Sequence, residues 1–361
     1  MGEIRLLSFN KPPFPSLQDM AKTVVRSSRF RLYFSSSDVR CADRNQAVTP
    51  MSLNQLSSGD LIADRRADYA KMLAEAGDAQ GAAELMAQAL ELVPNWAAGW
   101  FRLADYEEKS GRKEAAAEAL RNTLRLNPKD VFGAGLKLAL LGAVDTPEQP
   151  PSPYVERLFD DYAERFDRAL VEKLHYSVPE ELAALIERAG GRHFRHVVDL
   201  GCGTGLFGER IRGRADVLEG FDLSANMLAK AENKAIYDRL GQADLSLAPE
   251  RSGVFGTLAA GRADLVSAAD VLMYLGNLES VFVIADHLLA PGGLFAFSVE
   301  DGGMIDSFVL RSSLRYAHSE AYVVSRCTAS GLSIVAVERS TIRRDAGHPV
   351  AGILFIARKS A

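Results

Sequence analysis

The chain has 361 residues, of which 25% are charged and 47% are hydrophobic. This composition is globular and excludes disorder throughout, and the length allows about two domains. No apolar run approaches the roughly 18 to 20 residues that span a bilayer, so we expect no membrane partner. The net charge of −5 provides no general attraction to phosphate backbones, and nucleic acid is therefore disfavoured as a partner.

The three cysteines, Cys41, Cys202 and Cys327, are widely scattered. They offer neither a disulfide framework nor a CxxC metal knuckle, so we expect no metal site. The N-terminus also lacks the apolar core of a secretory signal. These features favour a reducing, cytoplasmic location.

Residues 1–55 differ in composition from the rest of the chain. The first fifty residues contain eight Lys and Arg against four Asp and Glu, together with short serine runs and no periodicity. We expect a disordered extension whose deletion leaves the stability unchanged. Two alternatives explain the composition equally well: an organellar transit peptide, or an over-long translation start with Met51 as the true first residue.

A repeat of 34 residues begins near Leu61. This spacing separates five residue pairs: Gly77 and Gly111, Ala70 and Ala104, Ala82 and Ala116, Leu92 and Leu126, and Pro94 and Pro128.

The period and these positions resemble the tetratricopeptide repeat (TPR), a helical hairpin in which small side chains let two helices approach closely. The resemblance covers residues 61–143, with two copies and a further helix over 131–143 that would cap the stack. It implies an all-α domain for protein contact or self-association. The alternative is another four-helix or five-helix bundle.

Four prolines fall between residues 145 and 153. Proline stiffens an extended connector and denies a continuous helix. We therefore predict a linker over 144–153 that separates the repeats from a second domain over 154–361.

The second domain alternates apolar strand-like runs with helical segments. Because this alternation is typical of a parallel sheet covered by helices, we predict an α/β domain. Two further runs at the C-terminus, 332–338 and 350–358, are joined without a helix and should pair antiparallel. The predicted parallel strands are residues 196–200, 217–221, 264–268 and 294–299.

A glycine-rich turn comes after the first of these strands. Gly201, Gly203 and Gly205 let the backbone approach a ligand, and an acid, Asp199, stands two residues before the first glycine. The dinucleotide pattern GxGxxG would need glycine at 206, where the chain has leucine. The pattern resembles class I S-adenosylmethionine-dependent methyltransferases. That resemblance implies a seven-stranded Rossmann-like sheet with an antiparallel last strand, and S-adenosylmethionine as cofactor.

The resemblance also implies a set of cofactor-binding residues. Asp222 would accept hydrogen bonds from the ribose hydroxyls, Asp244 would face the adenine amino group, and Ala243 would pack on the adenine ring. Asp199 would position the loop and the amino end of the methionine. The complete predicted set is Asp199, Gly201, Cys202, Gly203, Gly205, Asp222, Leu223, Met227, Ala243, Asp244 and Tyr162.

Tyr162 comes from a segment over 154–167 that resembles the helix closing over the cofactor in small-molecule methyltransferases. An equally good interpretation is an amphipathic helix that packs Phe159, Tyr162 and Phe166 on the sheet. Cys202 is interpreted as a small buried filler in the glycine loop.

The methyl acceptor should enter at the carboxyl ends of the strands. Candidate catalytic residues there are Asp270, Tyr274 and His318, and His318 is the best base by its unperturbed pKa, unless it only caps a helix. Glu300 and Asp301 come after the next predicted strand. Three arginines, Arg315, Arg343 and Arg344, would either bind an acidic substrate or lie solvated on loops.

The sequence thus predicts a methyltransferase whose acceptor is a small molecule, with a protein, which would suit the repeats, as the alternative acceptor. DNA amino methylation is disfavoured, since no Asn/Asp-Pro-Pro-aromatic motif follows the predicted strand over 264–268. The main alternative is a non-catalytic assembly factor or scaffold that binds S-adenosylmethionine. The intact acids and glycines favour the enzyme.

Overall fold

The computed structural model describes residues 56–163, 176–256, 258–345 and 347–360, and the predicted extension over 1–55 lies outside them. By its internal contacts the chain divides into two compact units, one up to Ala119 and one from Leu120 to Ala361. None of the described helices combines the length and apolar character needed to cross a bilayer.

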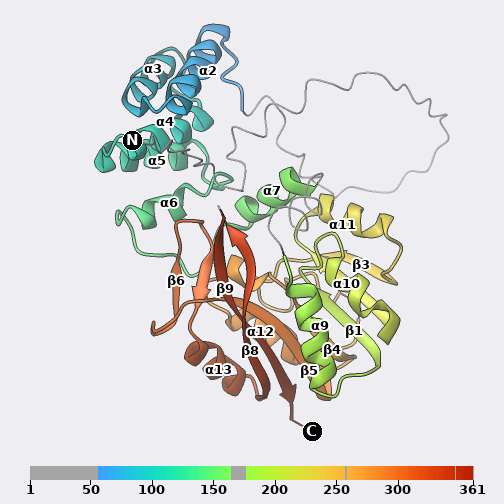
Figure 1. The fold of residues 1–361 in the computed structure, drawn as a ribbon. Helices are drawn as coiled ribbons and strands as arrows, with labels where there is room; N and C mark the ends of the chain where they lie inside the picture. Colours follow the sequence, from blue (N-terminus) through green and yellow to red (C-terminus); the bar gives the residue numbers. More distant parts are fainter. Residues whose placement is uncertain (1–55, 164–175, 257, 346, 361) are drawn as a thin grey trace, which may run out of the picture. The chain divides into compact units, whose positions relative to one another are not determined.

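The first unit is built from antiparallel helices joined by short turns (Figure 1). Asp60 starts the first of them because its carboxylate accepts hydrogen bonds from the backbone N–H of Ile62 and Ala63, both at 2.8 Å. Gly77 and Gly111, 34 residues apart, hold φ of +92° and +81° at equivalent turns. The helices are α2 (Leu61–Glu75), α3 (Ala79–Leu92), α4 (Ala97–Lys109) and α5 (Lys113–Leu126), the last of which continues into the second unit.

These helices lie where the 34-residue spacing places them. Alanines such as Ala70, Ala82 and Ala104 are buried, as close helix packing requires. The helical character of the region is confirmed, whereas its membership of the TPR family stays a prediction.

The second unit contains a mixed sheet of nine described strands in the order β3-β2-β1-β4-β5-β7-β6, with β9 pairing antiparallel to β5 and β8 to β9. The α/β prediction is confirmed. The expected number of seven strands is wrong for the described residues, since the short hairpin β6–β7 extends the sheet beyond β5. The strands are β1 (Phe194–Leu200), β2 (Ala215–Asp222), β3 (Arg239–Gln242), β4 (Ala263–Ala268), β5 (Leu289–Asp301), β6 (Phe308–Leu310), β7 (Tyr316–His318), β8 (Leu332–Asp345) and β9 (His348–Lys359).

Strands β1, β2, β4 and β5 pair in parallel, as the sequence predicts. The final antiparallel pair, β8 and β9, is confirmed as well. The sequence analysis missed β3, because its four residues carry no apolar alternation.

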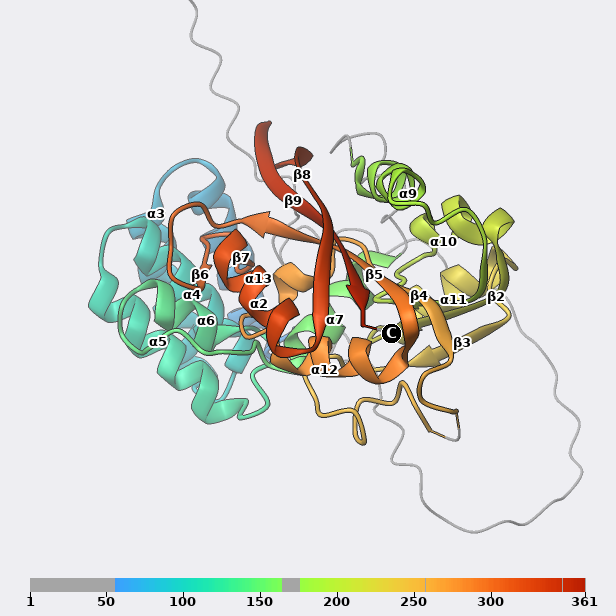
Figure 2. The same cartoon turned by 90° about the horizontal axis from the view of Figure 1, so that it is seen from below.

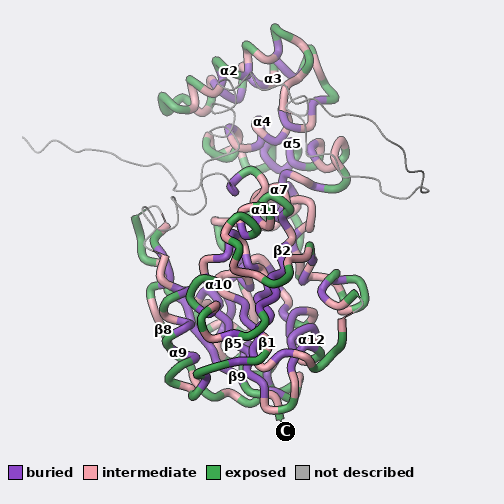
Figure 3. Tube along the Cα trace, turned by 90° about the vertical axis from the view of Figure 1, so that its right-hand side faces the viewer, coloured by how far each residue is buried: buried purple, intermediate pink, exposed green. Residues whose placement is uncertain are grey.

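Helices cover both faces of this sheet (Figure 2). Apolar side chains of α9 and α10 pack on one face, and those of α12 and α13 pack on the other. Buried positions follow the strands, while the outer sides of the helices are exposed (Figure 3). The helices are α6 (Ala134–Leu140), α7 (Ser152–Tyr162), α9 (Val178–Arg188), α10 (Leu206–Ile211), α11 (Ala225–Asn233), α12 (Glu279–Leu288) and α13 (Glu320–Ala329).

Helix α6 differs from the expectation that it caps the repeats. Its Leu136 packs with Leu310 and Tyr316 of the β6–β7 hairpin, so these contacts lie within the second unit. The predicted linker also contacts the sheet unit: the Tyr316 hydroxyl donates to the carbonyl of Pro147 at 2.8 Å. The proposed boundary over 144–153 stays a prediction.

Candidate functional site

The glycine loop between β1 and α10 has a backbone that favours glycine. Gly201, Gly203 and Gly205 have φ of +65°, +55° and +93°, in the left-handed region that other residues adopt at a cost. A Cβ at position 201 would also lie 2.8 Å from Cγ1 of Val271, which comes after β4. Glycine is therefore required at position 201 both by the backbone conformation and by the packing of Val271 against it.

Asp222 ends β2 beside this loop. One carboxylate oxygen accepts from the backbone N–H of Gly203 at 2.8 Å, and the other accepts from that of Ser224 at 2.9 Å. Burial raises the pKa of Asp222 to about 6, although both amide donors favour the ionised form. Each carboxylate oxygen can accept a further hydrogen bond, as binding of a ribose diol requires.

Asp199 lies deeper, 1% exposed near the end of β1. Its two oxygens accept from the Tyr237 hydroxyl at 2.7 Å and the Ser267 hydroxyl at 2.8 Å. Burial raises the pKa of Asp199 to about 6 against these two donors. The carboxylate thus holds the end of β1 to its neighbours, and its predicted contact with the cofactor stays untested.

Sequence reasoning missed Tyr237 as a site residue. Its ring occupies a slot in which a Cβ at Gly205, Gly208 or Gly220 would meet the ring at 3.1 Å or less. The phenol reaches Asp199 from this slot. The only sequence signal is glycine on both β2 and α10, and its meaning appears once the sheet brings these elements together.

The residues predicted to contact the adenine ring of the cofactor, Ala243 and Asp244, come directly after β3. The Ala243 backbone N–H donates to the Asp222 carbonyl at 2.9 Å. Asp244 accepts from the Ser246 hydroxyl at 2.6 Å, and Met227 is fully buried in the first turn of α11. Leu223 accepts a hydrogen bond through its carbonyl from Gln242 at 2.9 Å. These residues surround the end of β2, and their individual roles stay predictions.

Helix α7 joins this region through residues other than the predicted one. Asp160 accepts from the Ser224 hydroxyl at 2.6 Å, and the Phe159 ring lies 4.9 Å from that of Tyr274, edge to face. Tyr162 is 4% exposed at the end of the helix. The predicted segment continues to residue 167, and Phe166 lies outside the described residues.

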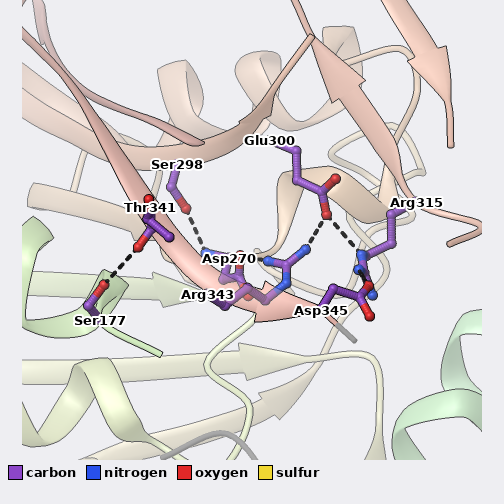
Figure 4. A network of polar contacts seen from close by, with 8 residues as sticks. All are labelled: Ser177, Asp270, Ser298, Glu300, Arg315, Thr341, Arg343 and Asp345. Atoms are coloured by element: carbon purple, nitrogen blue, oxygen red, sulfur yellow. Dashed lines mark hydrogen bonds and ion pairs between the residues drawn. The ribbon is translucent and has the colours of Figure 1, made fainter. Parts of the chain in front are cut away.

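Five charged residues gather where the acceptor is expected, and we call them the acceptor-side cluster (Figure 4). Arg343 on β8 pairs with Asp270 at 2.6 Å and with Glu300 of β5. Arg315 pairs with the same oxygen of Glu300 at 2.8 Å and with Asp345 at 2.5 Å. The cluster therefore brings together the predicted Asp270, Glu300, Arg315 and Arg343.

Asp270 is held in an unusual backbone conformation. Its φ is +59°, and its N–H donates to the Ser298 hydroxyl at 2.9 Å. Burial raises the pKa of the Asp270 carboxyl, while the Arg343 guanidinium opposes that rise. A non-glycine residue with positive φ marks a constrained position of the kind that occurs at functional sites.

His318 on β7 is not a member of the acceptor-side cluster. It is 0% exposed, and its Nε2 lies 2.9 Å from the Gly276 carbonyl, to which the neutral ring donates. Burial lowers the pKa of His318 to about 4. The imidazole is thus neutral at physiological pH and ties β7 to the loop after Tyr274, which suits a structural role better than the predicted base.

Two further candidates lie outside the acceptor-side cluster. Asp301 accepts from the backbone of Gly303 at 2.8 Å. Arg344 is exposed and donates to the Gly347 carbonyl at 3.1 Å. Asp301 also pairs with Arg339 of β8 at 3.5 Å, and neither Asp301 nor Arg344 bonds through its side chain to another candidate among the residues that the structure describes.

Comparison with known proteins identifies the domain. Residues 174–332 match a family model described as a methyltransferase domain. The chain carries a class I S-adenosylmethionine-dependent methyltransferase domain. The described residues fit that cofactor, because Asp222 ends a parallel strand beside the glycine loop and each of its carboxylate oxygens can accept a further hydrogen bond.

Curated relatives match over part of their length. Malonyl-[acyl-carrier protein] O-methyltransferase of Enterobacter lignolyticus is 32% identical over 129 residues, which is 34% of this chain and 48% of the relative. Ubiquinone biosynthesis O-methyltransferase of Cronobacter sakazakii is 30% identical over 125 residues, which is 35% of this chain and 50% of the relative. The chain thus spans about half the length of the relatives it matches.

Solved structures also resemble the chain. The 1,6-didemethyltoxoflavin-N1-methyltransferase of Burkholderia thailandensis gives a TM-score of 0.46 at 18% identity, and the match covers 60% of this chain and 94% of that protein.

Proposed function

We propose that the protein transfers the methyl group of S-adenosylmethionine to an oxygen atom of a small molecule. The observation that carries this proposal is Asp222. Its carboxylate is fixed at the end of β2 by hydrogen bonds from Gly203 of the glycine loop and from Ser224. A carboxylate at this position of a parallel sheet suits recognition of a ribose.

The cofactor supplies an already activated methyl group on a sulfonium, so the chain's own residues have to bind, orient and exclude water. The glycine loop and Asp222 would hold the cofactor. Helix α7 would cover the site, since Asp160 fixes it to Ser224 at the start of α11. Phe159 and Tyr274 would form an apolar wall between the cofactor and the acceptor.

Transfer to oxygen is supported by both curated relatives, which are named O-methyltransferases. A small acceptor is supported by the contacts of α7 with Ser224, after β2, and with Tyr274, after β4, because they would narrow the entry at the carboxyl ends of these strands for a protein side chain. Methylation of a protein remains the alternative within the enzyme hypothesis.

The helical N-terminal region would serve protein contact or self-association, as the resemblance to TPR repeats implies. Its support is the equivalent glycine turns at Gly77 and Gly111 and the buried alanines. The two described cysteines, Cys202 and Cys327, are free and buried, which agrees with a cytoplasmic location.

Calorimetric titration of the full chain with S-adenosylmethionine and S-adenosylhomocysteine tests the proposal. We expect micromolar binding that weakens by at least about tenfold in Asp222→Ala, since hydrogen bonds to a charged group are lost. Asp216→Ala is the matched control, because Asp216 lies on the same strand with its side chain 60% exposed.

Folded wild-type protein that binds neither ligand would contradict the enzyme. Binding without any turnover across a broad set of acceptors would instead favour the non-catalytic scaffold.

A further inference from the structure

The acceptor-side cluster borders the cofactor loop. Val271, the residue after Asp270, packs so closely on Gly201 that a Cβ there would overlap it. Tyr274 lies one turn later and contacts Phe159 of α7. A molecule between the glycine loop and α7 would therefore meet Tyr274 and, from the acceptor-side cluster, Asp270.

The arginines of the cluster and Glu300 are covered, whereas the other two acids, Asp270 and Asp345, are more open. The side chains of Arg343 and Arg315 are 2% and 5% exposed. Those of Asp270 and Asp345 are 14% and 25% exposed. An approaching molecule therefore meets carboxylate oxygens before it meets a guanidinium.

The charge balance points the same way. Each arginine already pairs with two carboxylates, and two guanidinium groups against three carboxylates leave one net negative charge when all are ionised. A carboxylate acceptor would add a second negative charge in a partly desolvated place, which is unfavourable. The charge of each guanidinium is therefore already balanced, which disfavours the sequence-based expectation that Arg315 and Arg343 bind an acidic substrate.

Asp270 and Tyr274 can each form a further hydrogen bond. One oxygen of Asp270 accepts from Arg343, while the other takes no hydrogen bond from any residue that the structure describes. The Tyr274 hydroxyl likewise bonds to none of the described residues, and burial raises the pKa of this phenol, so it stays protonated. Arg343 also has a buried Nε–H without an acceptor among these residues, so the chain alone does not satisfy every donor of the cluster.

These groups match a hydroxyl, which both donates and accepts a hydrogen bond. We propose that the acceptor carries a neutral hydroxyl group that donates to Asp270 and accepts from Tyr274, and that Asp270 takes its proton during methyl transfer. Arg343 is then a positioning residue for Asp270. This inference rests on the proposed function and narrows the class of its substrate.

Atoms and charges balance in this step. A new bond forms between the hydroxyl oxygen and the methyl carbon, the bond from that carbon to sulfur breaks, and its electron pair stays on sulfur. The hydroxyl proton passes to Asp270, which loses its negative charge as the sulfonium loses its positive one. A carboxyl with a raised pKa is better suited to accept the proton than an ordinary aspartate.

Calorimetry on the full chain saturated with S-adenosylhomocysteine tests the proposal with matched probes: 2-naphthol, 2-naphthoate and 2-naphthylmethylamine. We expect 2-naphthol to bind at least about tenfold more tightly than 2-naphthoate, because the carboxylate meets like charge. Asp270→Asn should remove most of this preference, while Asp301→Asn, at the end of β5, should keep it.

Tyr274→Phe is the second variant, since its hydroxyl bonds to no described residue and its loss should leave the melting temperature unchanged. We expect this variant to bind 2-naphthol about three- to tenfold more weakly than the wild type does. A preference for the naphthoate or the amine, or binding of none of the probes, overturns the inference. If S-adenosylhomocysteine still binds, a preference for the naphthoate or binding of none of the probes leaves the proposed function standing, whereas a preference for the amine also counts against oxygen as the acceptor atom.

Discussion

Ser224 and Asp160 share a hydrogen bond of 2.6 Å that joins the start of α11 to α7. The same serine oxygen accepts from the backbone N–H of Met227 at 3.0 Å and so caps α11. The Ser224 backbone N–H also donates to Asp222. Ser224 thus connects the first turn of α11, the predicted ribose-binding Asp222, and helix α7.

The first prediction concerns this connection. Asp160→Ala should release α7 from α11, because the remaining carbonyl contact of Asp160 with the Asn226 amide, at 3.2 Å, is exposed. Hydrogen exchange of the α7 amides should accelerate, and that of the sheet should not.

Asp161→Ala is the control for that measurement. Asp161 is the next residue, 39% exposed, and pairs with Arg157 within the same helix. Equal acceleration in both variants would show that the Asp160 bond does not hold the helix.

The second prediction concerns Asp199 and Tyr237. Tyr237→Phe removes a hydroxyl that donates to a buried carboxylate, so the free energy of unfolding should fall by about 1–3 kcal/mol at pH 7.5. The pKa of Asp199, about 6 when folded against a usual 3.8, means that its ionisation opposes folding. The free-energy cost of ionising Asp199 in the folded protein is therefore absent below about pH 4 and complete above pH 6.

The decrease in the free energy of unfolding caused by Tyr237→Phe should be larger at pH 7.5 than at pH 4.5, because the hydroxyl stabilises the ionised carboxylate more than the protonated one. Urea unfolding at pH 4.5 and 7.5 measures it. A loss that is larger at the lower pH would contradict this account of the pair.

The third prediction uses the slot around Tyr237. Gly208→Ala would put a Cβ 2.6 Å from Cζ of Tyr237, so it should lower stability by about 1–3 kcal/mol even though alanine favours helices. Gly213→Ala is the matched control, because no atom lies within 4 Å of the Cβ that it adds. Thermal unfolding compares the two variants, and equal melting temperatures would mean that the slot is not tightly packed.

The proximity of the glycine loop to Asp222 was predictable from the local sequence. Gly201, Gly203 and Asp222 lie on a turn and at a strand end whose spacing is fixed by the βαβ pattern, so their proximity follows from the chain order. The antiparallel β8–β9 pair was predictable for the same reason, since a short connection leaves no room for a crossover.

The acceptor side was not predictable in this way. Asp270 and Arg343 are 73 residues apart, and no periodicity links a turn after β4 to an inward residue of β8. The sequence identified both as charged residues near the carboxyl edge, but whether an arginine faces substrate or pairs with an acid depends on how β5, β7 and β8 meet. The same holds for α6, whose apolar face fits a helical stack and a hairpin equally well until its contact with Tyr316 is seen.

The last prediction is the pH dependence of cofactor binding. Asp222 has a pKa of about 6, raised by burial, so its carboxylate becomes protonated as the pH falls through 6 and then loses a hydrogen-bond acceptor for the ribose hydroxyls. Affinity for S-adenosylhomocysteine should therefore be constant above about pH 7 and fall by up to about tenfold by pH 5. In Asp222→Asn the affinity should be lower throughout and flat over this range, which separates Asp222 from Asp199 and Asp160 nearby. Calorimetry at several pH values measures both proteins, and a wild-type affinity that rises on acidification would refute the role of Asp222.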